Sequence, residues 1–196
     1  LLMIDLKGVR VGFVMTGSFC TFAEAFAAAE ALRQAGASLL PVMSEHAAGT
    51  DTRFGSALSH IQRLETICEK PVIRSIPEAE PIGPKHLTDI LVVAPCTGNT
   101  LAKLAASITD TTATMAVKSH LRTGNPVVLA VATNDALAGS AKNIGQLLNL
   151  KHYRFVPFGQ DQPTGKPTSL IADFTKIPQT LADALDGKQQ QPILLS

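Results

Sequence analysis

The sequence predicts an α/β protein built on a doubly wound parallel sheet. Two observations lead to this fold class. Short runs of branched apolar residues alternate with segments of about 10 to 15 residues that have helical periodicity, and each apolar run ends in small or polar residues. Strands joined by helices in this way form a parallel sheet with right-handed crossovers. One domain over residues 1–196 is expected, with its core at about 8–158 and a C-terminal loop and helix at 159–196.

The first part of the chain predicts a strand–helix–strand unit. Residues 9–15 form an apolar run that residues 16–18 interrupt with small and polar side chains. The alanine-rich residues 22–34 predict a helix, and Gly36 is its expected end signal because glycine readily adopts the left-handed conformation found after helices. Residues 38–43 form the second apolar run and the second predicted strand.

A second helix is predicted before the centre of the chain. Residues 47–53 are rich in Gly, Thr and Asp and predict a loop, and residues 56–69 predict an amphipathic helix. Residues 71–73 predict a short strand. Residues 76–85 hold three prolines and predict a surface connection. The apolar stripe of the helix consists of Leu58, Ile61, Leu64 and Ile67.

The central strand is predicted at residues 90–94, an uninterrupted run of branched apolar residues typical of a strand buried on both faces. Pro95 is expected to end it because proline has no N–H to donate to the sheet. Helices are predicted at 101–108 and 111–122, and another buried strand at 126–131.

The last part of the chain predicts two more helices, at residues 138–148 and 177–185, with a weak strand at 153–157 between them. Residues 158–167 are rich in Gly, Pro and Gln and predict a loop or lid. Residues 189–196 carry no interpretable pattern.

The composition excludes several classes of partner. The net charge is +1 and the sequence has no Lys/Arg run, so it provides no positive electrostatic field to attract nucleic acid or an anionic membrane. No apolar run reaches the ~18 residues of a membrane span. The N-terminal residues lack a signal-peptide pattern, and Cys20, Cys68 and Cys96 show no CxxC spacing. We therefore expect a cytoplasmic protein with reduced thiols, and no metal site because the five histidines form no metal-spaced cluster.

Small and polar residues follow four of the predicted strands. In open α/β sheets, ligands bind at the carboxyl ends of the strands. Hydroxyls and the N–H groups of a helix start suit a phosphate, and side-chain amides can pair with the edge of a heterocycle. These features favour FMN over a dinucleotide. The candidate cofactor-binding residues are Thr16, Gly17, Ser18, Ser44, Cys96, Thr97, Asn99, Thr100, Thr133 and Asn134.

Three segments together resemble a known family. Residues 94–100, followed by Asp110, are similar to the PASANT segment of the flavin-containing cysteine decarboxylase-like superfamily, residues 132–137 to its AMNxxM segment, and Gly17-Ser18 to its Gly-Ser loop. The order and spacing make the joint match more specific than any one piece. The resemblance implies a Rossmann-like flavoprotein fold, bound FMN, and homo-oligomers with flavin at the contacts between their protomers.

A closer resemblance covers nearly the whole chain. Residues 44–55 and 156–161, with Lys166 and Ser169, are similar to the family of B subunits of bacterial dipicolinate synthases. That resemblance implies a sporulation enzyme of the mother cell that oxidises dihydrodipicolinate to dipicolinate together with a separate A-type subunit. NAD(P) would enter through that partner.

Two departures from the decarboxylases leave alternatives open. Pro81 stands where that family carries a histidine, and residues 158–169 contain no cysteine for its substrate clamp. No residue qualifies as a general base, so the catalytic residues are unknown. The alternatives are a non-catalytic partner subunit that has lost flavin and a flavin-dependent decarboxylase of another small acid.

Individual candidates have simpler interpretations as well. Asn99 is also suited to a helix cap and Asn134 to an Asx turn, and the hydroxyl of Ser44 suits either a phosphate or a loop. For Cys96, a thiol that packs in the core is the preferred interpretation over a nucleophile. Arg53 is the candidate for binding a substrate carboxylate. The alternative interpretation is that it lies in a solvated loop and forms an ion pair with an aspartate.

Overall fold

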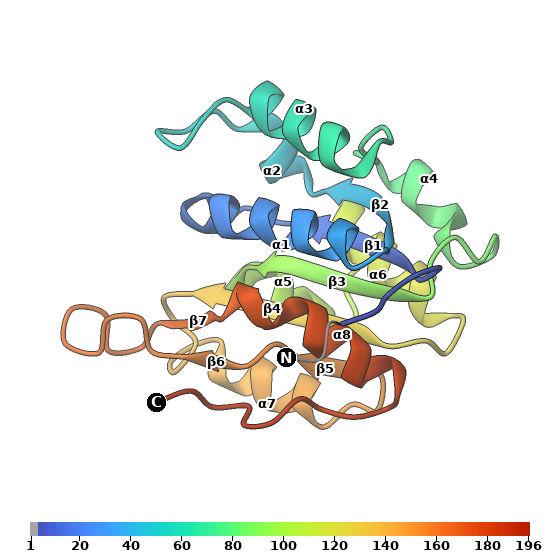
Figure 1. Cartoon of the computed structure of the whole chain (residues 1–196). Helices are drawn as coiled ribbons and strands as arrows, with labels where there is room; N and C mark the ends of the chain where they lie inside the picture. Colours follow the sequence, from blue (N-terminus) through green and yellow to red (C-terminus); the bar gives the residue numbers. More distant parts are fainter. Residues whose placement is uncertain (1–3) are drawn as a thin grey trace.

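The structure is a computed structural model that describes residues 4–196. Its centre is a seven-stranded sheet (Figure 1). The strands are β1 (Arg10–Met15), β2 (Ser38–Met43), β3 (Ile90–Cys96), β4 (Val127–Thr133), β5 (Tyr153–Phe155), β6 (Phe158–Gly159) and β7 (Leu170–Ala172). They follow the order β2-β1-β3-β4-β7-β6, and β5 also pairs with β4.

Helices cover both faces of the sheet. The α-helices are α1 (Phe22–Gln34), α2 (Glu45–Gly49), α3 (Ala57–Cys68), α4 (Ile76–Ala79), α5 (Gly98–Ala105), α6 (Thr112–Leu121), α7 (Ala141–Leu148) and α8 (Ile177–Leu185). Short 3-10 helices are η1 (Phe19–Thr21), η2 (Glu80–Ile82) and η3 (Phe174–Lys176). α1 and α8 lie together on one face with α3 beside α1, whereas α5, α6 and α7 cover the other face (Figure 1). None of the helices in the described part of the chain combines the length and apolar character needed to cross a membrane.

The direction of winding reverses between β1 and β3. β1 pairs in parallel with β2 on one side and with β3 on the other, and β3 continues in parallel to β4 and β4 to β5. An order of β2-β1-β3-β4-β5 places a topological switch point at the carboxyl ends of β1 and β3, where such sheets bind ligands. The predicted doubly wound, parallel α/β fold is confirmed.

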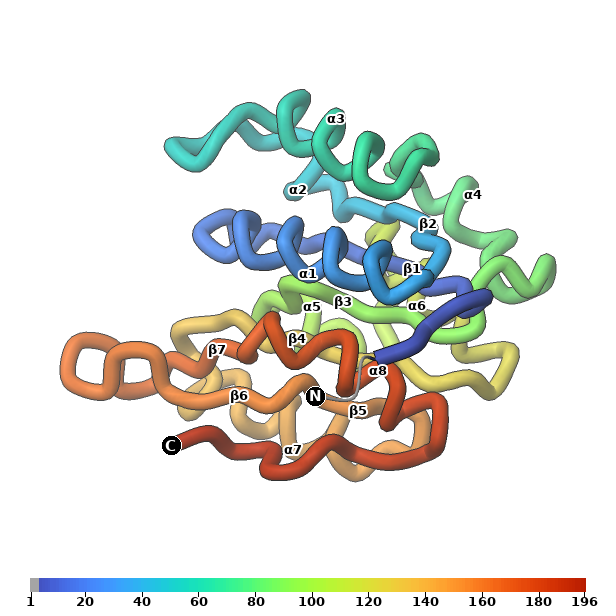
Figure 2. Tube along the Cα trace, viewed as in Figure 1, coloured from blue at the N-terminus to red at the C-terminus, as the bar shows by residue number. Residues whose placement is uncertain are grey.

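The edge beyond β4 departs from the prediction. β7 pairs antiparallel with the end of β4, and β6 pairs antiparallel with β7. β6 lies in the segment predicted as a loop or lid. The C-terminal residues run beside β6 (Figure 2), where the N–H of Leu195 donates to the carbonyl of Phe158 at 2.9 Å. Such pairing joins residues far apart in the sequence, so no local pattern reveals it.

Several local predictions need correction. Pro95 lies inside β3, because the pairing of β3 with β4 shifts register between Val93 and Cys96 and the strand continues past it. The loop predicted at 47–53 begins as helix α2. The short strand predicted at 71–73 is only an isolated bridge between Ile73 and Val42.

Two further predictions fail in detail. The connection at 76–85 contains α4 and η2. In α3 the predicted stripe is wrong at its first residue: Leu58 is 62% exposed, and His60 is buried instead. Steps of three residues drift away from the 3.6-residue period of the helix, so one end of the stripe leaves the core.

Candidate functional site

Two hollows open side by side at the switch point. The larger hollow, of about 610 Å³, lies between the ends of β1, β2 and β3 and the starts of α5 and α6. The smaller hollow, of about 300 Å³, lies over the ends of β3 and β4. Both are lined by Gly17 and Thr97, where they meet. The larger hollow contains the predicted residues Thr16, Gly17, Ser44, Thr97, Asn99 and Thr100, and the smaller contains Gly17, Ser18, Thr97, Thr133 and Asn134.

Gly17 leaves space that a side chain would fill. A Cβ added to it would meet only the Cβ of His46 at 3.5 Å and the ring of Phe19 at 3.7 Å, which are ordinary contacts. Its backbone does not adopt the left-handed conformation. Because neither packing nor backbone geometry in the described part of the chain requires a glycine here, the bare backbone at this junction fits close approach by a bound molecule.

Thr16 holds the ends of β1 and β3 together. Its hydroxyl donates to the carbonyl of Pro95 at 2.7 Å and accepts from the N–H of Thr97 at 3.1 Å. The residue is 1% exposed. Thr16 therefore fixes the floor between the hollows, with its hydroxyl already engaged.

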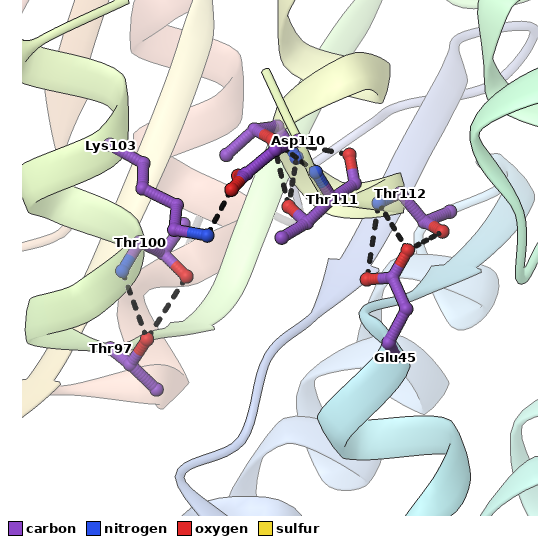
Figure 3. Close-up of polar contacts among 8 residues, drawn as sticks. Glu45, Thr97, Thr100, Lys103, Asp110, Thr111 and Thr112 are labelled. Atoms are coloured by element: carbon purple, nitrogen blue, oxygen red, sulfur yellow. Dashed lines mark hydrogen bonds and ion pairs between the residues drawn. The ribbon is translucent and has the colours of Figure 1, made fainter. Parts of the chain in front are cut away.

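The start of α5 presents polar groups to the larger hollow (Figure 3). The hydroxyl of Thr97 accepts from the N–H of Thr100 at 3.2 Å and lies 3.0 Å from the hydroxyl of Thr100, so Thr97 caps the helix. The alternative of a cap at Asn99 is therefore wrong. The side chain of Asn99 is exposed at the hollow, without a hydrogen-bond partner in residues 4–196. The N–H groups of Gly98 and Asn99 have no acceptor within the helix, and the helix dipole there favours an anion.

The opposite wall of the larger hollow is fixed by side chains of α2 and α6. Ser44 caps α2, since its hydroxyl accepts from the N–H of Ala47 at 3.2 Å. The carboxylate of Glu45 accepts from the N–H and the hydroxyl of Thr112 at 2.9 and 2.7 Å (Figure 3). These bonds tie the end of β2 to the start of α6, so this wall is held in place.

Lys103 lines the larger hollow but is already paired. Its ammonium donates to Asp110 at 2.7 Å (Figure 3). This hydrogen bond lowers the pKa of the Asp110 carboxyl below its ordinary value. Lys103 therefore closes the junction of α5 and α6.

The end of β4 is filled by the chain's own polar groups. Asp135 accepts from the hydroxyls of Thr133 at 2.6 Å and Ser140 at 2.8 Å. The bond from Thr133, joined by that from Ser140, lowers the pKa of Asp135 against the opposing effect of burial. A Cβ added at Gly98 would lie 2.8 Å from both hydroxyls and 2.9 Å from the carboxylate. Gly98 is thus a glycine because this cluster leaves no room for a side chain.

Asn134 borders the smaller hollow. Its side chain is exposed and has no partner in the described part of the chain, so an Asx turn does not account for it. Asn99 borders the larger hollow, so the two amides do not share one cavity as a site around a single ring would require. They lie on either side of the junction at Gly17 and Thr97.

Two candidates fall outside both hollows. Cys96 is completely buried in β3, and burial raises the pKa of its thiol. Arg53 is exposed, and its guanidinium lies over the ring of Phe54 at 4.9 Å. The suggested Asp–Arg pair is absent in the described residues, because Asp51 accepts from the N–H of Ala57 at 2.8 Å.

Sequence reasoning missed several residues that line the hollows. Glu45, His46 and Lys103 line the larger one, and Asp161, Lys166 and Ser169 line the smaller one. The last three stand in the segment that carries the closer family resemblance, which was the available signal. Burial tends to raise the pKa of Asp161, but the hydroxyl of Ser169, backbone N–H groups and Lys166 lower it overall. Residues 4–196 contain no cluster of three His, Cys, Asp or Glu side chains able to hold a metal ion.

A parallel sheet with open strand ends at the β1/β3 switch point is the arrangement of a flavin-type α/β protein. The chain belongs to the flavoprotein family, whose sequence profile matches residues 4–183. It is 43% identical over 193 residues to the B subunit of dipicolinate synthase of Bacillus subtilis (strain 168), a match that covers 98% of this chain and 96% of that protein. Both predicted family resemblances are confirmed.

Solved structures agree with this assignment. The crystal structure of the dipicolinate synthase B subunit from Bacillus halodurans C has a TM-score of 0.90 and 42% identity, covering 98% of both chains. The FMN-dependent cysteine decarboxylase SpaF has a TM-score of 0.67 and 23% identity, covering 92% of this chain and 99% of that one. The second likeness concerns the fold alone.

Proposed function

We propose that this chain is the flavin-binding B-type subunit of a dipicolinate synthase, which oxidises dihydrodipicolinate to dipicolinate. The 43% identity to the B subunit from Bacillus subtilis supports the assignment to this enzyme. The observation that carries the cofactor proposal is the room beside Gly17 at the junction of the two hollows, where neither a contact nor the backbone conformation in residues 4–196 requires a glycine. We name FMN because the polar groups around that space suit a phosphate and a ring edge.

The residues that would hold FMN are those whose polar groups remain available. Next to Gly17, the hydroxyl of Ser18 has the sulfur of Cys20, at 3.8 Å, as its one hydrogen-bond partner in the described residues. The leading N–H groups of α5 favour an anion. The side chain of Asn99, which borders the larger hollow, can donate and accept at a ring edge. Thr16, Thr97 and Thr133 would instead keep this frame in position through their hydrogen bonds.

When bound, FMN would supply the two-electron chemistry of the oxidation, which no side chain can supply. The chain's contribution is to bind and orient. The buried link between Thr16 and Pro95 keeps the two strand ends at a fixed distance. The contact of Glu45 with Thr112 keeps the far wall from moving. A rigid frame of this kind holds the reactants in a productive arrangement at little entropic cost.

The proposal includes partners. The chain would work with the enzyme's A-type subunit, through which NAD(P) would enter. It would form homo-oligomers in the cytoplasm of the mother cell of a sporulating bacterium. The decarboxylase alternative is less well supported, because Pro81 replaces the histidine of those enzymes and lines neither hollow.

Calorimetric titration of the purified chain with FMN tests the cofactor assignment. The wild-type chain should bind FMN, and Gly17→Val, which fills the junction of the two hollows, should bind it at least about 10-fold more weakly. Gly145→Ala is the matched control, since a Cβ there meets nothing within 4 Å and the residue borders neither hollow. A wild-type chain without affinity for FMN would support the alternative of a partner subunit that has lost flavin.

The oxidation is tested with both subunits present. Addition of dihydrodipicolinate to the FMN-loaded chain and its A-type partner should reduce the flavin absorbance and produce dipicolinate. Full activity of the A-type partner alone would contradict a flavin-dependent role for this chain. Release of carbon dioxide from another acid would instead support a decarboxylase.

A further inference from the structure

The smaller hollow contains a cation with hydrogen-bonding capacity left. Lys166 stands 3.7 Å from the carboxylate of Asp161, beyond a direct hydrogen bond, and its side chain is 52% exposed. By contrast, the ammonium of Lys103 in the larger hollow already donates to Asp110 at 2.7 Å. An ammonium has three donors, so Lys166 can bind an anion without giving up an existing hydrogen bond.

The backbone holds Lys166 at the rim of this hollow. Its N–H donates to the carbonyl of Gln162 at 2.7 Å, and its carbonyl accepts from the N–H of Ser169 at 3.1 Å. The next turn is tied to the end of β4, because the hydroxyl of Thr168 donates to the carbonyl of Asn134 at 2.6 Å. The segment predicted as a lid is therefore anchored at its base, and Lys166 has a defined position beside the strand ends.

Size and chemistry of the smaller hollow fit a small ring with carboxylates. Its volume of about 300 Å³ is at the lower end of ligand-sized pockets. Asn134 lines it together with Lys166 and offers donors to carboxylate oxygens or a ring nitrogen. The buried hydroxyl of Ser169 and the ammonium of Lys166 both stabilise the ionised carboxylate of Asp161. The negative charge of Asp161 is therefore balanced by groups of the chain itself.

We propose that the smaller hollow is the diacid subsite and that Lys166 binds one carboxylate of the substrate, with Asp161 orienting the ammonium. This assignment rests on the proposed function, from which the pyridine diacid is taken. A molecule in the smaller hollow would meet one in the larger hollow at Gly17 and Thr97, as transfer between substrate and cofactor requires. Arg53, the candidate from the sequence, lies outside both hollows, so we assign the carboxylate contact to Lys166 instead.

Binding of two pyridine acids tests the subsite. Pyridine-2,6-dicarboxylate and pyridine-2-carboxylate are titrated by calorimetry in metal-free buffer into the chain with and without FMN. Lys166→Gln should weaken binding of the diacid about 10- to 100-fold, the usual effect of losing a hydrogen bond to a charged group. It should also reduce the preference for the diacid over the monoacid, which a general loss of stability would not do. Lys166→Arg should restore most of the affinity.

Two controls separate the possible outcomes. Lys151→Gln removes an exposed lysine that borders neither hollow, and Arg53→Gln removes the rival cation; both should bind the diacid as the wild type does. Unchanged binding by Lys166→Gln, a loss only in Arg53→Gln, or no diacid binding by the wild type would overturn the subsite. FMN affinity measured on the same samples tests the cofactor separately, so either proposal can fail while the other stands.

Discussion

The two glycines at the ends of β1 and β3 have opposite surroundings. Gly17 has room for a side chain, because a Cβ there would make only ordinary contacts at 3.5 Å or more. Gly98 is enclosed by Ser140, Thr133 and Asp135, all within 2.9 Å of an added Cβ. The chain's own packing explains the second glycine, whereas nothing in residues 4–196 requires the first.

The same contrast divides the polar residues of the site. Thr16, Thr97 and Thr133 each use their hydroxyls inside the chain, to join strands, cap α5 or bind Asp135. Asn99 and Asn134 have exposed side chains with no partner in residues 4–196. Small polar residues at strand ends therefore serve two purposes, and those with unsatisfied side chains are the better candidates for ligand contact.

Of the substitutions considered, alanine at each of the two glycines should give the largest difference in unfolding free energy between two variants. Gly98→Ala forces a methyl group against Ser140, Thr133 and Asp135, and overpacking of this kind costs ~1–3 kcal/mol of unfolding free energy. Gly17→Ala has room for its methyl group and should change stability by no more than about 0.5 kcal/mol. Urea denaturation of both variants measures this. Equal losses of stability would contradict the distinction between a filled and an open turn.

Most of the fold could be predicted because its signals are local. The strand at residues 38–43 and the helices at 22–34 and 177–185 were located at their observed bounds, each from its own periodicity and end signals. The antiparallel β6 and β7 could not be predicted, since their short pairings depend on β4 and on the C-terminal residues. A pattern within one segment does not encode such distant partners.

The site was predicted only in part for a related reason. Strand-end chemistry located both hollows, but it could not separate hydroxyls used internally, such as Thr133, from those left open. It also included Cys96, although that side chain lies in the core. Strand-end chemistry did not locate Lys166 at the smaller hollow, because the residue lies in an irregular segment whose position beside β4 depends on the hydrogen bond from Thr168 to Asn134.

Substitutions at the N-cap and in the first turn of α5 should change the free energy of unfolding by an intermediate amount. Thr97→Ala removes the cap that accepts from Thr100, so stability should fall by ~1 kcal/mol, and Thr97→Ser should retain it. Asn99→Ala removes a side chain without a partner and should change stability by no more than about 0.5 kcal/mol while weakening FMN binding. Denaturation and FMN titration measure the two effects. A loss of stability in Asn99→Ala similar to that in Thr97→Ala would contradict the assignment of the cap.

The smallest expected effect is the pH dependence contributed by the filled turn. Hydrogen bonds, first from Thr133 and then from Ser140, lower the pKa of Asp135 in the folded chain below its ordinary value of 3.8. A carboxyl with a lowered folded-state pKa adds stability above its unfolded-state pKa, and this contribution is lost as the pH falls through the folded-state value. The stability difference between wild type and Asp135→Asn should therefore be greatest near neutral pH and should shrink as the pH falls below about 4. Thr133→Val, which removes the hydrogen bond that lowers this pKa most, should shrink that difference at neutral pH as well. Urea denaturation over this pH range measures both effects, and a difference that stays constant throughout would mean that Asp135 only fills space beside Gly98.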